Sequence, residues 1–365
     1  MTALKLEKRA RSLEDVRIVL IDRNNYHQYL HLSYQIITAV RQVSDLTIPI
    51  SRLLQGKKID FFQATVQEID LSQKVVKTDR GDLPYDQLAI ALGSEPNYYN
   101  IKGAEENSFS LSSIGTAVQI RDALRKTPEQ GEEVDIVVGG GGFTGVELAG
   151  EIVEKSRCCV TIVEAAKTLL PSWESPRLSG KVLNTLTKMG LRIVLGRSIE
   201  EVKPNSITLS DGSQVECSLF VWAGGIQASS VASKSGLKTG RGNRVVIDEF
   251  CEAVGFPGVY VVGDCALVVD PQTGEVLPPC IEIALQQAEV VAKNMYADAV
   301  EAKRTLYVPR FSGLILAVGE NYAIGRVFGV RVEGWLAKTL KRLTHLHYVY
   351  ILRGLRRTLG EIMGD

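Results

Sequence analysis

A glycine-rich turn near the middle of the chain constrains the fold more than any other feature of the sequence. Residues 135–139 are apolar enough to form a buried strand, and Gly140, Gly142 and Gly145 follow with the spacing GxGxxG before a helical stretch. In that setting Gly140 permits a tight turn, Gly142 lets a pyrophosphate approach the backbone, and Gly145 lets the helix pack closely on the strand. The N-terminus of the helix would offer free N–H groups to the phosphates. The pattern predicts a βαβ unit that binds a dinucleotide; the alternative is a glycine turn without a ligand.

A carboxylate follows the glycine turn at the place where such units recognise a ribose. The apolar stretch 160–164 ends in Glu164, about twenty residues beyond the turn. Its side chain could accept hydrogen bonds from both hydroxyls of an adenosine ribose, whereas a 2′-phosphate would meet a like charge. The sequence therefore favours NAD(H) over its phosphorylated form.

Residues 1–110 are predicted to form most of a second nucleotide-binding unit. The apolar stretch 16–22 ends in Asp22, which repeats the arrangement of strand and carboxylate, and a helical segment is expected before it at residues 2–10. A complete unit would place a strand and a glycine loop before that helix. We therefore expect this unit to lack its first strand and glycine loop, through truncation or a misassigned start. The alternative is a separate fold in which the aspartate is incidental.

Composition excludes several classes of function. The chain has 365 residues, of which 45% are hydrophobic, and this is enough for two or three domains with real cores. A formal net charge of zero does not favour nucleic acid as a partner. The six cysteines form no CxxC pair and the four histidines lack ligand spacing, which argues against a metal site built by the protein. No apolar run reaches about 18 residues, so we expect no spanning helix and a cytoplasmic location, or attachment to a membrane from that side.

The remaining patterns divide the chain into three parts. Apolar strands are expected to end at Gly93, Gly224 and Asp264, and a helix is expected over residues 281–300. The βαβ spacing predicts a largely parallel sheet around the glycine turn. We expect one domain from residues 1–112 and 236–305, a second from residues 113–235, and a C-terminal region from residues 306–365.

The C-terminal region combines basic and aromatic residues. The basic residues are Lys338, Lys341, Arg342, Arg353, Arg356 and Arg357, and they alternate with Trp335, Tyr348 and Tyr350. This combination is typical of an amphipathic helix that lies on an anionic lipid surface. An ordinary domain-capping or dimer helix is the alternative.

Together these pieces resemble the two-dinucleotide-binding flavoprotein superfamily over essentially the whole chain. The chain is most similar to the single-subunit type II NADH:quinone oxidoreductases, through the stretches 21–27, 33–35, 85–94, 221–225 and 261–264 and through the C-terminal helix. The resemblance implies an α/β protein with two Rossmann-like FAD/NAD(P)-binding domains, the first truncated at its N-terminus, and a C-terminal region that associates with a membrane.

The resemblance also implies roles for individual residues. Asp22 would bind the adenosine ribose of FAD, Gly93 would lie near FAD at the domain crossover, and Asp264 would hydrogen-bond the ribityl–pyrophosphate region. NADH would be held by Gly140, Gly142, Gly145 and Glu164, and the nicotinamide site would be lined by Trp222, Ala223 and Gly224.

The expected reaction passes a hydride from NADH to FAD and then two electrons and two protons to a membrane quinone, without proton pumping. The cofactors carry the redox chemistry, so the protein has to position them and exclude water. Glu147 and Glu282 are candidates for positioning or proton supply, and Glu282 and Gln286 stand where the family has two glutamines at its quinone site. A purely structural glutamate near a helix N-terminus is the alternative for Glu147.

Three departures and two rival functions accompany this resemblance. The FAD glycine loop is absent, Glu282 replaces a glutamine, and His31 and Ser33 stand near the flavin ring where the family tends to have proline and leucine. A sulfide:quinone oxidoreductase would use redox cysteines, for which Cys265 and Cys280 are the candidates. The other rival is a non-catalytic, truncated flavoprotein that binds NADH. A homodimer is a further expectation for the partners.

Overall fold

The computed structural model describes residues 1–125, 134–156, 158–173 and 175–353. These residues form two compact units, each assembled from separate stretches of the chain. Unit 1 contains Met1–His27, Ile48–Glu95 and Ile226–Phe311; unit 2 contains Gln28–Thr47, Pro96–Gly225 and Ser312–Asp365. Compact units need not coincide with nucleotide-binding domains, so the boundaries expected from the sequence remain a prediction.

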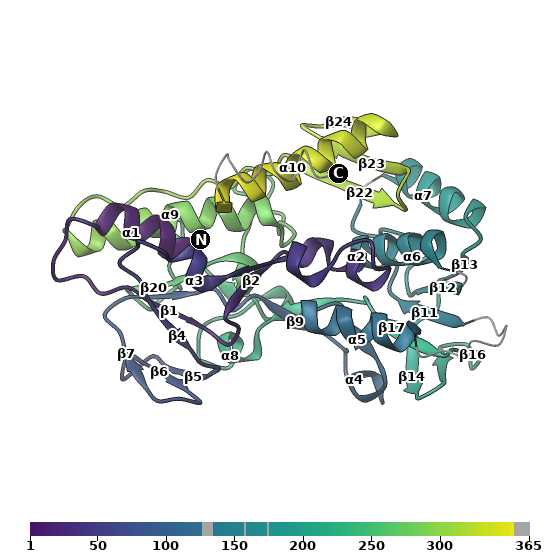
Figure 1. The fold of residues 1–365 in the computed structure, drawn as a ribbon, viewed down its shortest axis with the longest axis horizontal. Coiled ribbons are helices and arrows are strands. Elements are labelled where there is room, and N and C mark those ends of the chain that lie inside the picture. Colours follow the sequence, from purple (N-terminus) through teal and green to yellow (C-terminus); the bar gives the residue numbers. More distant parts are fainter. Residues whose placement is uncertain (126–133, 157, 174, 354–365) are drawn as a thin grey trace. The chain divides into compact units, whose positions relative to one another are not determined.

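Unit 2 is built on a five-stranded parallel sheet with the strand order β10-β17-β11-β12-β13 (Figure 1). Its strands are β10 (Phe109–Ser110), β17 (Leu219–Trp222), β11 (Asp135–Gly139), β12 (Cys159–Glu164) and β13 (Arg192–Leu195). Helix α6 (Phe143–Lys155) connects β11 to β12, and α7 (Pro176–Lys188) connects β12 to β13. Ile136, Val138 and Ile162 are fully buried, as expected for central strands covered on both faces. The predicted βαβ unit with a parallel sheet is confirmed.

Two antiparallel sheets and several helices complete unit 2. One sheet contains β14 (Ile199–Lys203), β15 (Ser206–Leu209) and β16 (Gln214–Glu216), and the other contains β22 (Gly313–Val318), β23 (Tyr322–Val327) and β24 (Val330–Glu333). Helix α10 (Trp335–Arg353) follows β24 directly. The remaining helices are α2 (Tyr34–Ile37), α4 (Ala104–Asn107) and α5 (Ile114–Arg125). The backbone of α6 lies close to the β22–β23 turn at Gly150: a Cβ on this glycine would lie 2.8 Å from the backbone nitrogen of Gly319.

The parallel strands of unit 1 form separate pairs instead of one wide sheet. β1 (Val19–Asp22) pairs with β4 (Asp60–Gln63), and β8 (Leu88–Ile90) pairs with β20 (Val259–Val261). Helix α1 (Thr2–Ala10) packs on the long helix α9 (Ile281–Ala299), where Leu6 and Ala10 meet Ala292 and both Lys5 and Arg9 form ion pairs with Glu289. The helix expected at residues 2–10 is present as α1, and the strand expected at residues 16–22 is present over its last four residues as β1.

Shorter elements complete the chain. Unit 1 also has the antiparallel sheet of β5 (Val66–Asp70), β6 (Val75–Thr78) and β7 (Leu83–Pro84), the pair β19 (Val245–Val246) and β21 (Ala266–Leu267), and the helices α3 (Ile50–Leu53) and α8 (Ser230–Ser233). Four short strands lie where the chain passes from one unit to the other: β2 (Tyr26–Gln28), β3 (Thr47–Pro49), β9 (Ser94–Pro96) and β18 (Ile226–Ala228).

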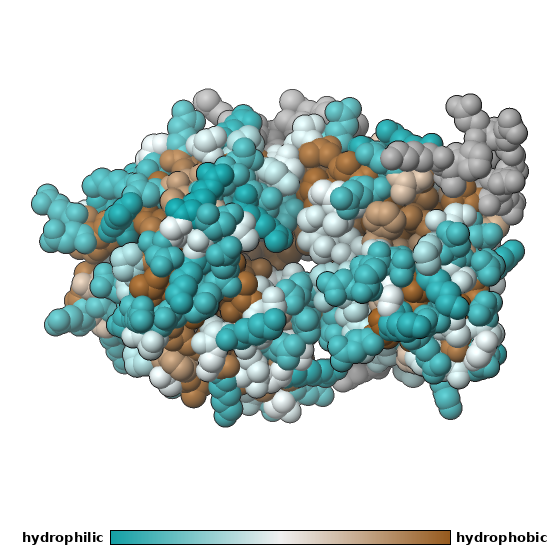
Figure 2. All heavy atoms as spheres, turned by 90° about the horizontal axis from the view of Figure 1, so that it is seen from below, coloured by the Kyte–Doolittle hydropathy of each residue, from teal (hydrophilic) through white to brown (hydrophobic). Residues whose placement is uncertain are grey.

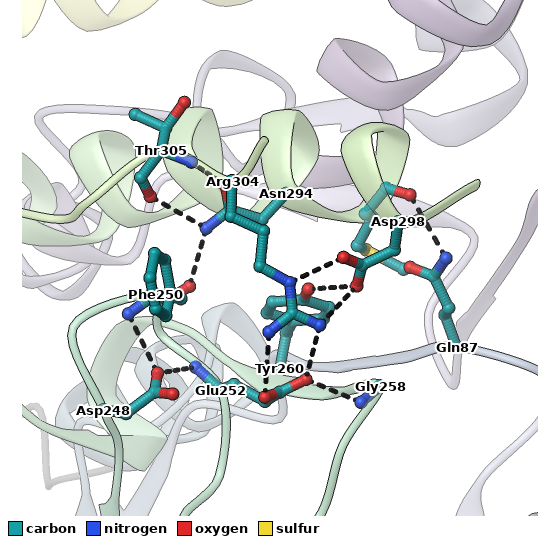
Figure 3. A network of polar contacts seen from close by, with 11 residues as sticks. Gln87, Asp248, Phe250, Glu252, Gly258, Tyr260, Asn294, Asp298, Arg304 and Thr305 are labelled. Carbon is teal, nitrogen blue, oxygen red and sulfur yellow. Dashed lines mark hydrogen bonds and ion pairs between the residues drawn. The ribbon is translucent and has the colours of Figure 1, made fainter. Parts of the chain in front are cut away.

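An arginine joins the end of α9 to the strands beneath it in unit 1 (Figure 3). Arg304 donates to both carboxylate oxygens of Asp298, at 2.6 and 2.8 Å, and to both oxygens of Glu252, at 3.1 and 3.2 Å. The hydroxyl of Tyr260 donates to the same Asp298 at 2.5 Å, and its ring lies under the guanidinium. Because Arg304 is paired with two carboxylates on different segments, it fixes the loop after α9 on the core.

Polar side chains cover most of the face drawn in Figure 2, with apolar side chains in patches between them. Such scattered apolar surface is ordinary for a folded protein. Within the described ranges, none of the helices combines the length and hydropathy that a bilayer-spanning segment needs.

Candidate functional site

The glycine turn after β11 has the shape that a pyrophosphate site requires. Gly140 has φ of +119°, and a Cβ there would lie 2.4 Å from the carbonyl oxygen of Ala223. A Cβ on Gly145 would lie 2.0 Å from the carbonyl oxygen of Gly140, so helix α6 and the turn are in backbone contact. In contrast, a Cβ on Gly142 would meet no atom within 4 Å. Open space therefore lies above the one glycine that a phosphate would approach, while the other two are closed by backbone.

Glu164 holds the turn as well as ending β12. Its Oε2 accepts the N–H of Gly141 at 2.7 Å, and its Oε1 accepts the N–H of Ala166 at 2.8 Å. An ionised carboxylate has about four acceptor positions, so each oxygen keeps capacity for a ribose hydroxyl. The sequence indicated the ribose role but did not reveal this clamp on the turn, since the bond to Gly141 depends on how β11 and β12 are paired.

The end of β17 closes around the same turn. Ala223 donates its N–H to the carbonyl oxygen of Gly139 at 2.8 Å, and a Cβ on Gly140 would lie 2.7 Å from the Cα of Gly224. Trp222 is buried and donates its indole N–H to the carbonyl oxygen of Asn97 at 3.0 Å. The structure thus brings Gly224 beside the glycine turn at one edge of the sheet, as expected for residues that end neighbouring parallel strands.

Glu147 lies one turn into α6 and is paired with the C-terminal helix. It forms an ion pair with Lys341 of α10 and accepts the N–H of Ala317 of β22 at 3.1 Å. Its side chain is only 15% exposed. No local pattern relates two residues 194 positions apart, so this partner could not be predicted from the sequence, which assigned Lys341 only to a lipid-facing helix.

Two more carboxylates follow Glu147 on the same face of α6. Glu151 is 5% exposed and accepts the hydroxyl of Thr38 at 3.1 Å, and burial raises the pKa of Glu151 above its usual value. Glu154 accepts the side-chain amide of Asn321 at 3.1 Å and the N–H of Glu320. Positions i, i+4 and i+7 share one side of a helix. The acidic side of α6 therefore holds both the segment 28–47 and the C-terminal hairpin.

The residues expected to hold a flavin lie at strand ends of unit 1. Asp22 ends β1, where its Oδ1 accepts the N–H of Asn24 at 2.8 Å and burial raises its pKa. Asp264 follows β20 and accepts the hydroxyl of Ser94 at 2.8 Å. Gly93 has φ of +71° with no atom within 4 Å of a built Cβ. Carboxylates with spare acceptor positions and an open glycine fit the ribose and ribityl hydroxyls of FAD.

The expected quinone-site residues occupy the first turns of α9. Glu282 lies in the first turn and is partly buried. Gln286 uses both ends of its amide on one residue: its nitrogen donates to the carbonyl oxygen of Arg310 at 2.7 Å, and its oxygen accepts the N–H of Arg310 at 2.9 Å. Gln287, which the sequence did not single out, is fully buried and accepts the N–H of Gly263 at 2.8 Å.

The cysteines are poorly placed for redox chemistry. All six are free thiols. Cys265 is fully buried, its thiol donates to the carbonyl oxygen of Gly93 at 3.0 Å, and burial raises its pKa to about 12. Burial also raises the pKa of Cys280. A reactive thiol needs the thiolate form, so neither cysteine has the environment of a redox centre. Among the described residues, no group of three or more potential ligands is placed to hold a metal ion.

The exposed side of α10 carries a stripe of apolar residues between polar ones. Leu336, Leu343 and Tyr350 are exposed and are spaced seven residues apart, which is close to two helical turns. Trp335 is 77% exposed, and Phe328 in the preceding β23–β24 turn is 80% exposed. We call these five residues the candidate membrane face. Exposed Lys338 and Arg342 flank it; Arg353 ends the helix, and Arg356 and Arg357 lie outside the described residues.

Comparison with known proteins agrees with this geometry. Residues 2–288 match the sequence profile of the pyridine nucleotide-disulphide oxidoreductase family. The chain belongs to this family. It is 29% identical to proteins named type II NADH:quinone oxidoreductase from Staphylococcus saprophyticus and Staphylococcus aureus, over 97% of this chain and 93% of each relative. The resemblance drawn from the sequence is thus confirmed.

Solved structures share the fold. The structure titled NDH2 from Plasmodium falciparum in complex with NADH has a TM-score of 0.81 at 16% identity, covering 95% of this chain and 92% of the other. The sulfide:quinone oxidoreductase from Aquifex aeolicus has a TM-score of 0.79 at 18% identity, covering 96% and 88%. The expected fold class, with Rossmann-like nucleotide-binding domains, is confirmed.

Proposed function

We propose that this protein oxidises NADH and transfers the electrons through FAD to a quinone. The observation that carries the proposal is the glycine turn of unit 2, in which Gly142 faces open space between a helix N-terminus and the carboxylate of Glu164. Quinone as the electron acceptor is supported by the curated relatives named type II NADH:quinone oxidoreductase, which align over 97% of this chain.

NADH binding follows from the chemistry of the turn. The first N–H groups of α6 have no partner within the helix and point toward the open side of the turn, where they suit the pyrophosphate of NADH. The remaining acceptor positions of Glu164 suit the hydroxyls of the adenosine ribose. Gly224 and Trp222 at the end of β17 would line the nicotinamide side.

Asp22, Gly93 and Asp264 would hold the FAD. When bound, the flavin supplies the redox chemistry by accepting a hydride from the nicotinamide and passing two electrons on to the quinone. The side chains then contribute orientation and the exclusion of water, without a nucleophile or a metal and without proton pumping.

Reduction of a quinone also consumes two protons, and carboxylates near the reaction could supply them. Glu147, mostly buried and paired with Lys341, is the first candidate. Glu282 is the corresponding candidate on α9. Gln286 is occupied by the backbone of Arg310, so we assign it a positioning role.

The candidate membrane face would bring the protein to its quinone. Aromatic and aliphatic side chains flanked by Lys338 and Arg342 suit the headgroup region of an anionic lipid surface. We therefore propose peripheral attachment to the cytoplasmic side of the cell membrane through α10.

An anaerobic spectrum of the purified chain, prepared with FAD, tests the proposal. The expected result is a flavin band at about 450 nm that bleaches with NADH and returns with a soluble quinone. Gly142→Ala is the matched control, which should retain the flavin and bleach only at higher NADH. A flavin band that NADH leaves unchanged would overturn the proposal. Quinone reduction that depends on sulfide and not on NADH would favour the sulfide-oxidising alternative.

A further inference from the structure

Helix α10 places polar as well as apolar side chains against the protein, since Lys341 and His345 are half-buried while Ala337 and Val349 are fully buried. Ala337, Lys341, His345 and Tyr348 recur every three or four residues and form one stripe. We call these residues the inner stripe. Ala337 is fully buried, and Lys341 pairs with Glu147 of α6. The docking of α10 within unit 2 therefore combines apolar packing with polar contacts, and the polar contacts can respond to pH.

The next contact along the inner stripe joins α10 to the segment 28–47 through two histidines. The Nε2 atom of His31 lies 3.2 Å from the Nδ1 atom of His345, within hydrogen-bonding distance. Their ring centroids are 5.4 Å apart, with the rings inclined at 54°. Both rings are half-buried. A bond between two imidazole nitrogens needs one N–H donor and one nitrogen without a proton.

Two tyrosines pack around this pair. Tyr29 meets the rings of His31, His345 and Tyr348 edge to face, with centroids 5.4 to 6.4 Å apart, and Tyr348 packs likewise on His31. Tyr29 is 1% exposed. Burial raises the pKa of Tyr348, so it stays neutral over the range in which histidine titrates. The aromatic packing limits access of water to the facing nitrogens.

The geometry accepts one proton easily and resists a second. With one added proton the bond becomes charge-assisted, from an imidazolium donor to a neutral acceptor. With two, both facing nitrogens carry hydrogen, the bond is lost and two like charges face each other at short range. Lys341, one turn before His345 on α10, and the neighbouring Arg342 add positive charge, while Glu147 of α6 offsets Lys341.

We propose that His31 and His345 form a proton-operated latch, which holds α10 on the segment 28–47 at neutral pH and releases it in acid. When α10 is released, both histidines can take up a proton, whereas the docked pair holds one. Release is therefore linked to the uptake of about one proton below the ordinary histidine pKa of about 6.5. The docking equilibrium should weaken by up to about tenfold per pH unit below that value.

The tests of the latch, histidine titration and backbone exchange, need neither NADH nor quinone, so failure of the latch would leave the proposed function untouched. The latch would make the presentation of the candidate membrane face depend on pH, because that face and the inner stripe belong to the same helix. A helix held by His31 would present its apolar side in a fixed orientation, and a released helix would not.

Histidine-selective NMR of the whole chain tests the latch directly, since the protein has only four histidines. The expected result is two coupled signals, from His31 and His345, with one titration step near or above the ordinary value and a second well below it. Independent titration of His31 and His345, each near the ordinary value, would overturn the proposal.

Hydrogen exchange of the α10 backbone provides the second measurement. Corrected for intrinsic rates, the protection of residues 335–353 should fall several-fold or more between about pH 7 and about pH 5.5. The double substitution His31→Gln with His345→Gln should remove that dependence, and His347→Gln should keep it. Equal pH dependence in the wild type and the double variant would also overturn the proposal. The wild-type titration decides the matter even where the double variant folds poorly.

Discussion

Two glycine-to-alanine substitutions in one turn should separate folding from NADH binding. A Cβ at Gly142 meets no atom within 4 Å, and the backbone there is extended, with φ of −76° and ψ of −171°. Alanine is therefore accommodated, and its smaller unfolded-state entropy contributes about 0.4–1 kcal/mol of stability. Losing glycine at the helix N-cap offsets part of this gain. We expect the free energy of unfolding of Gly142→Ala to stay within about 1 kcal/mol of wild type.

The same methyl group enters the space through which a pyrophosphate would approach the backbone. Displacing the phosphate from one charge-assisted hydrogen bond costs about 1.5–3 kcal/mol. The Kd for NADH should therefore rise about 10- to 150-fold. Gly145→Ala is the contrasting variant, since its Cβ would clash with the backbone, 2.0 Å from the carbonyl oxygen of Gly140. The turn and α6 must then separate by about 1 Å, which should lower the free energy of unfolding by about 1–3 kcal/mol as well as weaken binding.

Urea unfolding and NADH titration by calorimetry measure both quantities on the same preparations. We expect Gly142→Ala to lose NADH binding while it keeps its stability, and Gly145→Ala to lose both. A Gly142→Ala protein that binds NADH with the wild-type Kd would show that the pyrophosphate does not lie over this turn. A Gly145→Ala protein of wild-type stability would show that the backbone contact between α6 and the turn is not tight.

Further substitutions test other parts of the structure. Arg304→Met should lower the free energy of unfolding by about 3–5 kcal/mol, because two partly buried carboxylates lose their counter-ion; a loss below about 1 kcal/mol in urea would contradict this. Glu164→Arg should shift kcat/KM toward NADPH, and an unchanged preference would mean that Glu164 does not face the ribose. Leu343→Glu should weaken co-sedimentation with anionic vesicles about tenfold or more, by removing apolar contact and adding a like charge; unchanged binding would exclude this side of α10. Cys265, with its raised pKa, should resist iodoacetamide at about pH 8 until the chain is unfolded, and rapid alkylation of the native protein would refute its burial.

Structural features that depend only on neighbouring residues could be predicted from the sequence. The glycine turn, β12 ending in Glu164, and α1 followed by β1 each depend on neighbours within a few positions, since a tight turn, an apolar strand and a helix are local structures. The parallel order of the sheet follows from the βαβ connection, which leaves few topologies open. The sequence also indicated an amphipathic basic and aromatic helix at the C-terminus.

Only the tertiary structure decided which side of that helix faces the protein and which is exposed. It turned Lys341 and Tyr348 toward the protein, paired Glu147 with Lys341 across 194 positions, and placed His31 against His345 across 314. It also gave Gln286 a backbone partner in Arg310 and made Glu164 a clamp on the turn. These contacts arise where helices and a hairpin from distant parts of the chain pack together, and no local periodicity encodes which polar groups will then face one another. The sequence by itself determined the dinucleotide turn. The packing of distant segments determined which carboxylates, cation and histidines meet around α6 and α10.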